Sequence, residues 1–368
     1  MSERQGLLSE TKAALDTPAL LVDLDVMAGN IERIARTCRE AGVRWRPHTK
    51  GQKTPEIIRM ELAAGASGIT CAKVGEAEVM VAAGIGDILI ANEIVGAIKA
   101  KRLAELLGRA DITVAIDNKR SVAELGDAAA ATGGRRLGIV VEVDIGMHRA
   151  GVEPGPAVVE LANAAALHPR LAFRGVMGWE SQATTIADPL LKERTVVEAI
   201  QRLAASADAC RAAGHKVDIV SCGGTGTFPY CIRQPGVTEV QVGGGIFSDV
   251  HYMTHYHEDF APALTILATV ISRPTESRIV IDAGRKTMSG DSAMPQPIGL
   301  PPVKSMRLSA EHATIELEAP SELPRIADKI ELIVGYSDTT VHLHEEIVAI
   351  RSGGIEDVWR VLGRGKIK

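Results

Sequence analysis

Short apolar runs alternate with longer alanine- and leucine-rich stretches of helical period through roughly the first two thirds of the chain. This alternation is typical of repeated βα units around a parallel sheet. We predict eight strands of this kind, at residues 43–47, 67–71, 87–91, 112–116, 137–143, 172–178, 217–221 and 238–243. Eight strands with helices between them predict an α/β fold in which a (β/α)8 TIM barrel is the main unit.

The pattern changes after about residue 260, where strand-like runs are separated by turns. These runs are ALTILATVIS, SRIVIDAG, HATIELEA, DKIELIVG, EEIVAIRSG and IEDVWRVLG. A further strand-like run at 19–25 is left over once the barrel is closed. We therefore predict a barrel domain over 26–255 and a C-terminal β-rich domain that also includes the N-terminal strand, over 1–25 and 256–368. The Pro-, Gly- and Ser-rich stretch 288–305 is expected to be a long loop.

Charge and cysteine usage exclude several classes of partner. The net charge of −5 and the lack of a basic stripe argue against a nucleic-acid surface. No apolar run approaches the roughly 18 residues of a membrane span, and the N-terminus lacks the apolar core of a signal peptide. Five cysteines without a CxxC pair indicate reduced thiols. We expect a cytoplasmic protein that acts on a small molecule, without a nucleic-acid or membrane partner.

Glycine-rich segments follow the seventh and eighth predicted strands, where (β/α)8 enzymes commonly bind phosphate through converging backbone N–H groups. Lys50 follows the first strand and Arg149 the fifth, so both open onto the same end of the barrel. A phosphate site, a lysine and an arginine at one barrel mouth indicate pyridoxal 5'-phosphate, carried by Lys50 with Arg149 near its ring. The loop residues expected to bind it are Cys222, Gly223, Gly224, Thr225 and Gly226 after the seventh strand, and Gly243, Gly244 and Gly245 after the eighth.

His48 lies two residues before Lys50, and in an extended segment both side chains point to the same side. We expect His48 to orient the lysine or its neighbours. A purely structural histidine is the alternative.

The chain resembles the D-threonine aldolase and D-serine dehydratase-like group, fold-type III pyridoxal-phosphate enzymes related to alanine racemase. The similar segments span 17–368 and include TPALLVDLD, RPHTKGQKTPEI, GITCAKVGEAE, NEIVG, VEVDIGMHRAGV, CGGTGT, IDAGRKT, EHA, SDTTVHLHEE and RGKIK. The resemblance implies a barrel and a β-domain that work as a homodimer. It also implies that Lys50 carries the cofactor, that Arg149 and the loop at 223–226 bind it, and that the C-terminal domain holds a divalent metal.

The sequence departs from the family pattern at three polar positions. Relatives have His-x-Asp or His-x-Cys as metal ligands, a histidine two residues after the lysine, and a tyrosine after the sixth strand. The corresponding residues here are Tyr336 and Asp338, Gln52, and Trp179, which Glu180 follows. We expect Trp179 to contact the cofactor in place of the tyrosine.

Asp338 is the one conventional metal ligand that remains in the segment GYSDTT. A hard cation such as Mg²⁺ or Mn²⁺ accepts a carboxylate and several waters, whereas Zn²⁺ prefers nitrogen or sulfur. In a strand, His342 and His344 would share a face with each other and with Asp338 and Tyr336, and one of them could replace the lost ligand. The predicted metal site is therefore Asp338, Tyr336 and His344. The alternative is that Asp338 only caps a turn, no metal binds, and Tyr336 is a direct acid or base.

The leading functional hypothesis is a lyase that cleaves a D-3-hydroxy amino acid to glycine and an aldehyde, with Lys50, His48, Arg149 and Tyr336 as catalytic residues. Elimination by a D-serine or 3-hydroxyaspartate dehydratase is the first alternative. A racemase, which needs a base on each face of the substrate, is the second. A non-catalytic protein that only binds pyridoxal phosphate is the third, although such proteins are typically the barrel alone.

Overall fold

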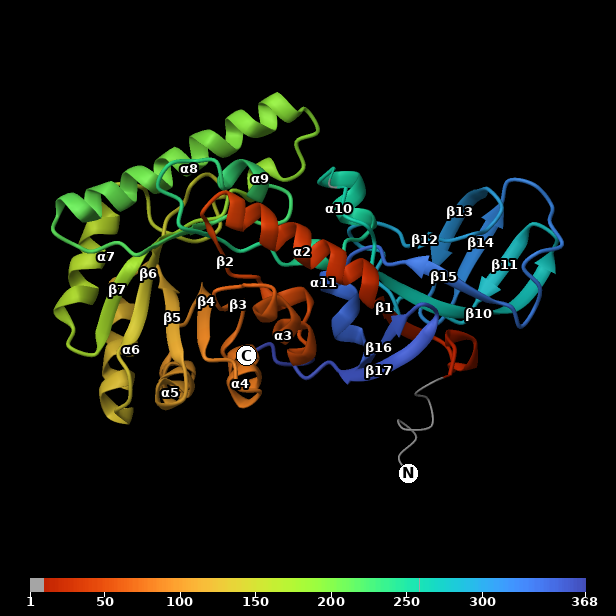
Figure 1. Ribbon diagram of the computed structural model, residues 1–368, viewed down its shortest axis with the longest axis horizontal. Coiled ribbons are helices and arrows are strands. Elements are labelled where there is room, and N and C mark those ends of the chain that lie inside the picture. The colour runs from red at the N-terminus through yellow and green to blue at the C-terminus, as the bar shows by residue number, and fades with distance from the viewer. Residues whose placement is uncertain (1–9, 258) are drawn as a thin grey trace.

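The structure is a computed structural model that describes residues 10–257 and 259–368, and it has two lobes (Figure 1). Eight parallel strands form the first lobe, in the spatial order β2-β9-β8-β7-β6-β5-β4-β3. A bridge between His48 and Thr70 closes the circle between β2 and β3. All eight predicted barrel strands are confirmed. Their bounds are β2 Arg44–Trp45, β3 Ile69–Cys71, β4 Asp87–Glu93, β5 Asp111–Ile116, β6 Leu137–Glu142, β7 Leu171–Met177, β8 Ile219–Cys222 and β9 Glu239–Val240.

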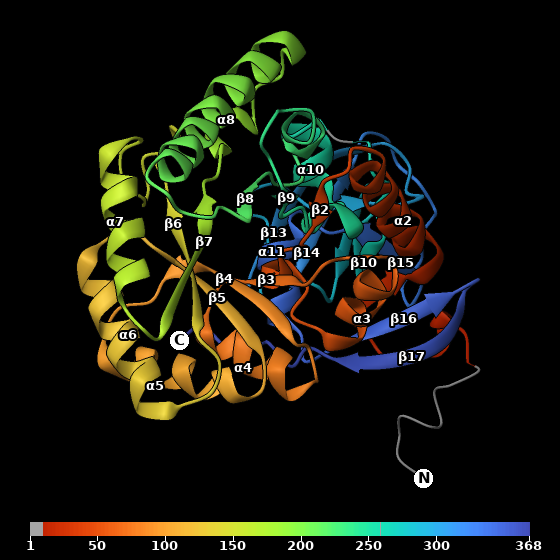
Figure 2. The ribbon, with the colours of Figure 1, turned by 60° about the vertical axis from the view of Figure 1, so that its left-hand side comes forward.

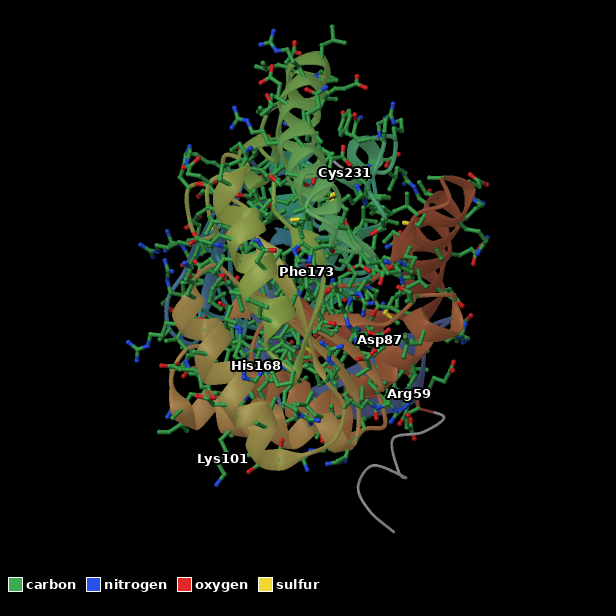
Figure 3. The ribbon with its side chains drawn as sticks, turned by 90° about the vertical axis from the view of Figure 1, so that its left-hand side faces the viewer. Arg59, Asp87, Lys101, His168, Phe173 and Cys231 are labelled. Atoms are coloured by element: carbon green, nitrogen blue, oxygen red, sulfur yellow. The ribbon has the colours of Figure 1, made fainter. Side chains whose placement is uncertain are left out.

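Helices surround these strands on the outside (Figure 2). They are α2 Leu24–Glu40, α3 Pro55–Ala63, α4 Val74–Ala82, α5 Ala97–Glu105, α6 Lys119–Thr132, α7 Pro156–Leu167 and α8 Pro189–Ala212. Every residue of β6 is buried, because barrel side chains cover one face and helices the other. The outer face is polar: Lys101 of α5 points away from the barrel (Figure 3). Continuous apolar runs are therefore the expected signature of these strands, and the sequence shows them.

The second lobe is a nine-stranded mixed sheet. Its strands are β1 Ala19–Asp23, β10 Leu264–Thr275, β11 Arg278–Ile281, β12 Gln296–Pro297, β13 Val303–Leu308, β14 Ala313–Leu317, β15 Lys329–Ile333, β16 Glu346–Arg351 and β17 Gly354–Arg360. Strand β1 pairs antiparallel with β10 and parallel with β16, so the N-terminal strand joins this sheet. The exact domain boundaries stay a prediction.

The expectation of a loop throughout 288–305 is wrong in part. Strand β12 lies inside it and pairs with β15, and β13 begins in it and pairs with β14. Pro297 belongs to β12, which pairs with β15 alone, and a proline is compatible with such an edge position. Turn-forming residues therefore concealed two strands whose pairing partners come later in the chain.

Two short helices lie where the lobes meet, α10 Val250–His255 and α11 Ser337–Thr340, and a third, α9 Phe228–Cys231, packs against α8. The start of α10 is tied to the second lobe, because the N–H groups of Val250 and His251 donate to Val334 and Gly335. In return, the Ser337 N–H of α11 donates to Asp249, 2.8 Å away. These bonds place α11 beside the barrel mouth. Over the residues described, no helix is both long and apolar enough to cross a membrane.

Candidate active site

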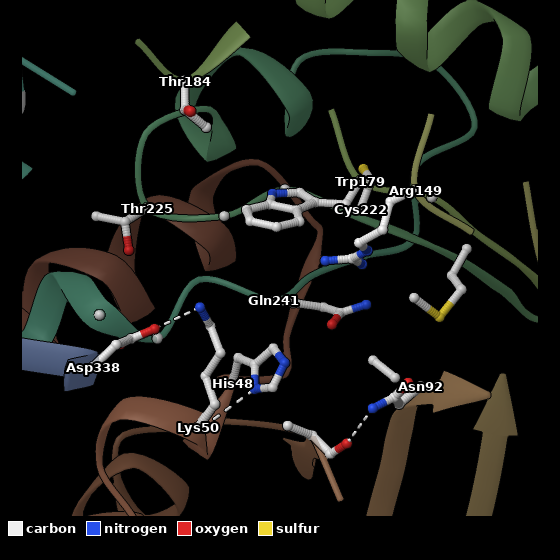
Figure 4. Close-up of a pocket in the computed structure, with 18 of the residues that line it drawn as sticks. His48, Lys50, Asn92, Arg149, Trp179, Thr184, Cys222, Thr225, Gln241 and Asp338 are labelled. Carbon is white, nitrogen blue, oxygen red and sulfur yellow. Dashed lines mark hydrogen bonds and ion pairs between the residues drawn. The ribbon is translucent and has the colours of Figure 1, made fainter. Parts of the chain in front are cut away.

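A cavity of about 330 Å³ opens at the carboxyl ends of the barrel strands, and residues at α10 and α11 also line it (Figure 4). The predicted site residues that line it are His48, Lys50, Arg149, Trp179, Cys222, Gly223, Gly224, Thr225, Gly243, Gly244, Tyr336 and Asp338. Gly226, Gly245 and His344 do not line it. The structure thus brings together most residues that the sequence singled out, from the ends of five barrel strands and from the second lobe. Their roles remain predictions.

Lys50 reaches across the cavity to the second lobe. Its Nζ lies 2.5 Å from the Asp338 Oδ2 and 5.8 Å from the centre of the Trp179 ring (Figure 4). Burial alone would lower the pKa of Lys50, but the Asp338 carboxylate raises it above its ordinary value. In this structure Lys50 is therefore a fixed ammonium group at the centre of the cavity.

The His48 side chain is bonded to the backbone of the turn that carries Lys50. The extended segment expected from His48 to Lys50 is wrong, because Thr49–Gly51 form a turn of 3-10 helix with His48 as its N-cap. The His48 Nδ1 accepts a hydrogen bond from the Lys50 N–H at 3.3 Å. Burial, and then the charge of Lys50, lower the pKa of His48 to about 3, so its ring is neutral. His48 thus holds the turn that presents the lysine.

The glycines of the loops after β8 and β9 lie so close to neighbouring groups that several of these positions have no room for a side chain. A Cβ on Gly243 would lie 2.2 Å from the His48 carbonyl oxygen, and one on Gly244 would lie 2.0 Å from the Tyr252 hydroxyl. Among the residues described, the N–H groups of Thr225, Gly226 and Gly244 donate to no acceptor. Unpaired backbone donors in a buried loop are suited to an anion such as a phosphate group.

Glu180 anchors the loop after β8 from behind, a role that the sequence did not reveal. Its buried carboxylate accepts hydrogen bonds from the Thr227 hydroxyl, and from the Gly223 N–H and the Cys231 thiol at 3.4 Å each. Burial raises the pKa of Glu180 and of Cys231. Over the described part of the chain, one group of ligand-type side chains could hold a metal, namely Glu180, Cys222 and Cys231, with ligand atoms within 4.8 Å of one another.

Arg149 lies over the Trp179 ring, with its Cζ 5.5 Å from the ring centre (Figure 4). The guanidinium is also 3.7 Å from the Glu142 Oε1 at the end of β6. Burial, and then hydrogen bonding and repulsion from Glu93, raise the pKa of Glu142 to about 8. A fixed cation and a protonated carboxyl group therefore lie side by side at this end of the cavity.

Asp338 and Tyr336 form the end of the cavity that the second lobe provides. The Tyr336 hydroxyl donates to the same Asp338 Oδ2 that contacts Lys50, at 3.0 Å. Burial alone would raise the pKa of Asp338, but the ammonium of Lys50 lowers it below its ordinary value. Burial, and then the Asp338 charge, raise the pKa of Tyr336, so its hydroxyl remains protonated. Asp338 is therefore an ionised carboxylate that accepts a hydrogen bond from the protonated hydroxyl of Tyr336.

His344 lies outside this group. The strand expected from Tyr336 to His344 is wrong: α11 is a helical turn, and Val341–Leu343 continue it as a 3-10 turn. Strand periodicity therefore does not apply, and the His344 Nε2 faces the Thr287 carbonyl oxygen at 2.6 Å. That contact holds His344 away from Asp338.

The sequence missed further lining residues. Asn92, near the end of β4, and Gln241, directly after β9, both line the cavity. Thr184, Tyr252 and Tyr256 line it as well. Asn92 directly follows the predicted strand 87–91, and Gln241 lies near the end of the predicted strand 238–243. These positions were a usable signal, because chemistry in a barrel gathers at the carboxyl ends of its strands. For the two tyrosines the signal was their i,i+4 spacing beside the glycine loop.

Comparisons with known proteins agree with this architecture. The family "Alanine racemase, N-terminal domain" matches residues 22–250, and "Putative serine dehydratase domain" matches residues 263–350. The crystal structure of D-threonine aldolase from Filomicrobium marinum has 35% identity and a TM-score of 0.95, covering 98% of this chain and 99% of that chain. The 3-hydroxy-D-aspartate aldolase of Paracoccus denitrificans is 34% identical over 96% of this chain and 94% of its own.

A dehydratase is also similar. The structure of D-threo-3-hydroxyaspartate dehydratase from Delftia sp. HT23 has 27% identity and a TM-score of 0.83, covering 96% of this chain and 99% of that chain. A variant of that dehydratase, with a cysteine replaced by alanine, has been solved in the metal-free form.

Proposed function

Because the chain belongs to the alanine racemase N-terminal domain family, with a serine dehydratase-type domain after it, we propose that it is a pyridoxal-phosphate lyase that cleaves a D-3-hydroxy amino acid to glycine and an aldehyde. The observation that carries the proposal is one cavity in which Lys50, Arg149 and the two glycine loops face Asp338 of the second lobe. Aldolases and dehydratases among the relatives support the lyase class.

The residues present fit pyridoxal 5'-phosphate. Lys50 would carry it, the unpaired N–H groups of Thr225 and Gly244 would hold its phosphate, and Arg149 would lie near its ring. When bound, the cofactor supplies an electron sink for the pair released at the substrate Cα.

The chain's own residues would orient the substrate and move its protons. Lys50 Nζ is placed to exchange a proton at Cα, and neutral His48 keeps the lysine turn in place. Trp179 covers one side of the cavity and limits the access of water to it (Figure 4). The cavity ends at Asp338, a carboxylate of the second lobe, where a substrate hydroxyl would meet it.

The metal expected at Asp338, Tyr336 and His344 does not fit the donors found there. A protonated phenol is a poor ligand, and His344 is bonded to Thr287. The group around Glu180 has ligand-type atoms, but its carboxylate already accepts three hydrogen bonds. We therefore assign no step to Mg²⁺, Mn²⁺ or another metal.

A cytoplasmic homodimer remains part of the proposal. It is supported by five free, buried cysteines, which suit a reducing compartment. Exposed apolar side chains on the second lobe, including Ile298, Leu323 and Ile326, offer a surface that a second copy could cover.

Separate product assays test the reaction. Purified holoenzyme is incubated with D-threonine, D-3-phenylserine and D-3-hydroxyaspartate, and aldehyde, glycine, ammonia and 2-oxo acid are each measured. We expect aldehyde and glycine in equal amounts. Ammonia with 2-oxo acid would establish the dehydratase instead, the L-enantiomer would establish a racemase, and no product at all would leave a cofactor-binding protein.

A further inference from the structure

We infer that the hydroxyl end of the cavity works without a divalent metal, because Tyr336 takes the place of a metal ligand and holds Asp338 as the base for the substrate hydroxyl. This inference rests on the proposed lyase function. It concerns how the chain's own side chains handle the hydroxyl proton.

The carboxylates that could bind a metal at this end of the cavity already accept hydrogen bonds from other groups. Asp338 Oδ2 takes both the ammonium of Lys50 and the hydroxyl of Tyr336. In the neighbouring Asp249 carboxylate both oxygens already accept hydrogen bonds, Oδ1 from the Tyr252 N–H and Oδ2 from the Ser337 N–H, each at 2.8 Å. Within the described ranges, the one cluster of three ligand-type residues does not include Asp338. A hard cation would find one carboxylate here, which already accepts the Tyr336 hydroxyl, while His344 faces the Thr287 carbonyl oxygen.

Aromatic packing fixes the Tyr336 phenol. Its ring centre lies 4.8 Å from that of His251 and 5.8 Å from that of Tyr252, both on α10. Tyr252 in turn packs edge-on against Tyr256 at 5.1 Å. Three of the four tyrosines in the chain therefore gather at this cavity. The orientation of Asp338 is set by these packed rings and the phenol, with no need for a coordinated ion.

The geometry suffices for a balanced proton cycle. Asp338 takes the proton of the substrate's β-hydroxyl while the Cβ–O bond becomes a carbonyl and the Cα–Cβ bond breaks, leaving the electron pair at Cα. Lys50 Nζ, 2.5 Å from the same carboxylate oxygen, relays that proton to Cα. The proton lost by oxygen is gained by carbon, so glycine and an aldehyde form without a further reagent. In this cycle Asp338 is the catalytic base and Tyr336 is a positioning residue.

Metal content is the first test, and it does not depend on turnover. Elemental analysis of holoenzyme purified without chelator should find far less than one metal ion per chain. Exhaustive chelation should leave aldehyde release within about twofold of its starting value. About one equivalent of metal, together with activity that chelation removes and Mn²⁺ or Zn²⁺ restores, would overturn the inference.

Variants at position 336 supply the second test. Tyr336→Phe removes only the hydroxyl and should lower kcat by about 10- to 100-fold with little change in KM, since Asp338 loses its orienting donor. Tyr336→His places an imidazole two residues from Asp338 and should take up about one equivalent of Zn²⁺ or Mn²⁺ in calorimetric titration. Tyr230→Phe, the tyrosine outside the cavity lining, is the matched control and should change neither property.

The outcomes separate this inference from the proposed function. If Tyr336→His binds no more metal than wild type, and Tyr336→Phe keeps wild-type kcat, Tyr336 does not hold Asp338 and the inference fails. If no D-3-hydroxy amino acid releases aldehyde, the proposed function fails, while the metal measurements still report on the donors around Asp338.

Discussion

Replacing Glu142 by glutamine should change how stability depends on pH. The folded protein keeps a proton on Glu142 up to about pH 8, whereas an ordinary glutamate loses it near 4.5. The contribution of Glu142 to the stability of the folded protein is therefore fully present below about pH 4.5, and it is lost as the pH rises towards 8. Each pH unit in that window costs about 1.4 kcal/mol at most. Glu93 shares the proton and Arg149 favours the charged form, and both effects reduce this cost. We therefore expect the free energy of unfolding to fall by about 1–3 kcal/mol between pH 5 and 7.

Thermal unfolding of holoenzyme at several pH values measures this effect. Glutamine mimics the protonated carboxyl group, so Glu142→Gln should match wild type near pH 5 and unfold a few degrees higher near pH 8, at roughly 2 °C per kcal/mol. Glu153→Gln, an exposed position, is the control and should follow wild type at every pH. A difference between Glu142→Gln and wild type that stays constant from pH 5 to 8 would refute the reasoning.

Three further predictions concern the cavity. Lys50→Ala should lose the visible absorbance of bound cofactor and at least about 1000-fold in activity, and a borohydride-reducible cofactor link that survives in the variant would contradict the assignment of Lys50. Arg149→Ala should lower kcat/KM by about 10- to 100-fold while the melting temperature stays within about 3 °C, and wild-type kinetics would assign Arg149 to the surface. Gly243→Ala should weaken cofactor binding in equilibrium titrations by at least about tenfold, because the new Cβ would lie 2.2 Å from the His48 carbonyl oxygen, whereas Gly86→Ala, with open space at its Cβ, should bind as wild type does.

Local sequence pattern was enough for the barrel and for one half of the candidate site. A strand buried on both faces must be apolar throughout, so β6 and its neighbours could be read from composition and spacing. The position of Lys50, Arg149 and the glycine loops followed, because each lies in the segment that follows such a strand. Parallel strands in one barrel present their carboxyl ends at one mouth, and this rule needs no tertiary coordinates.

Tertiary structure decided the other half. Lys50 and Asp338 are 288 residues apart in sequence, and their contact depends on how the second lobe packs against the barrel through α10. The same packing turns the segment after Tyr336 into helix, which sends His344 to Thr287 and away from Asp338. A short polar segment carries little intrinsic preference for strand or helix, so its long-range partners determine its conformation. The sequence thus determined where Lys50 lies, and only the packed structure decided which groups face it.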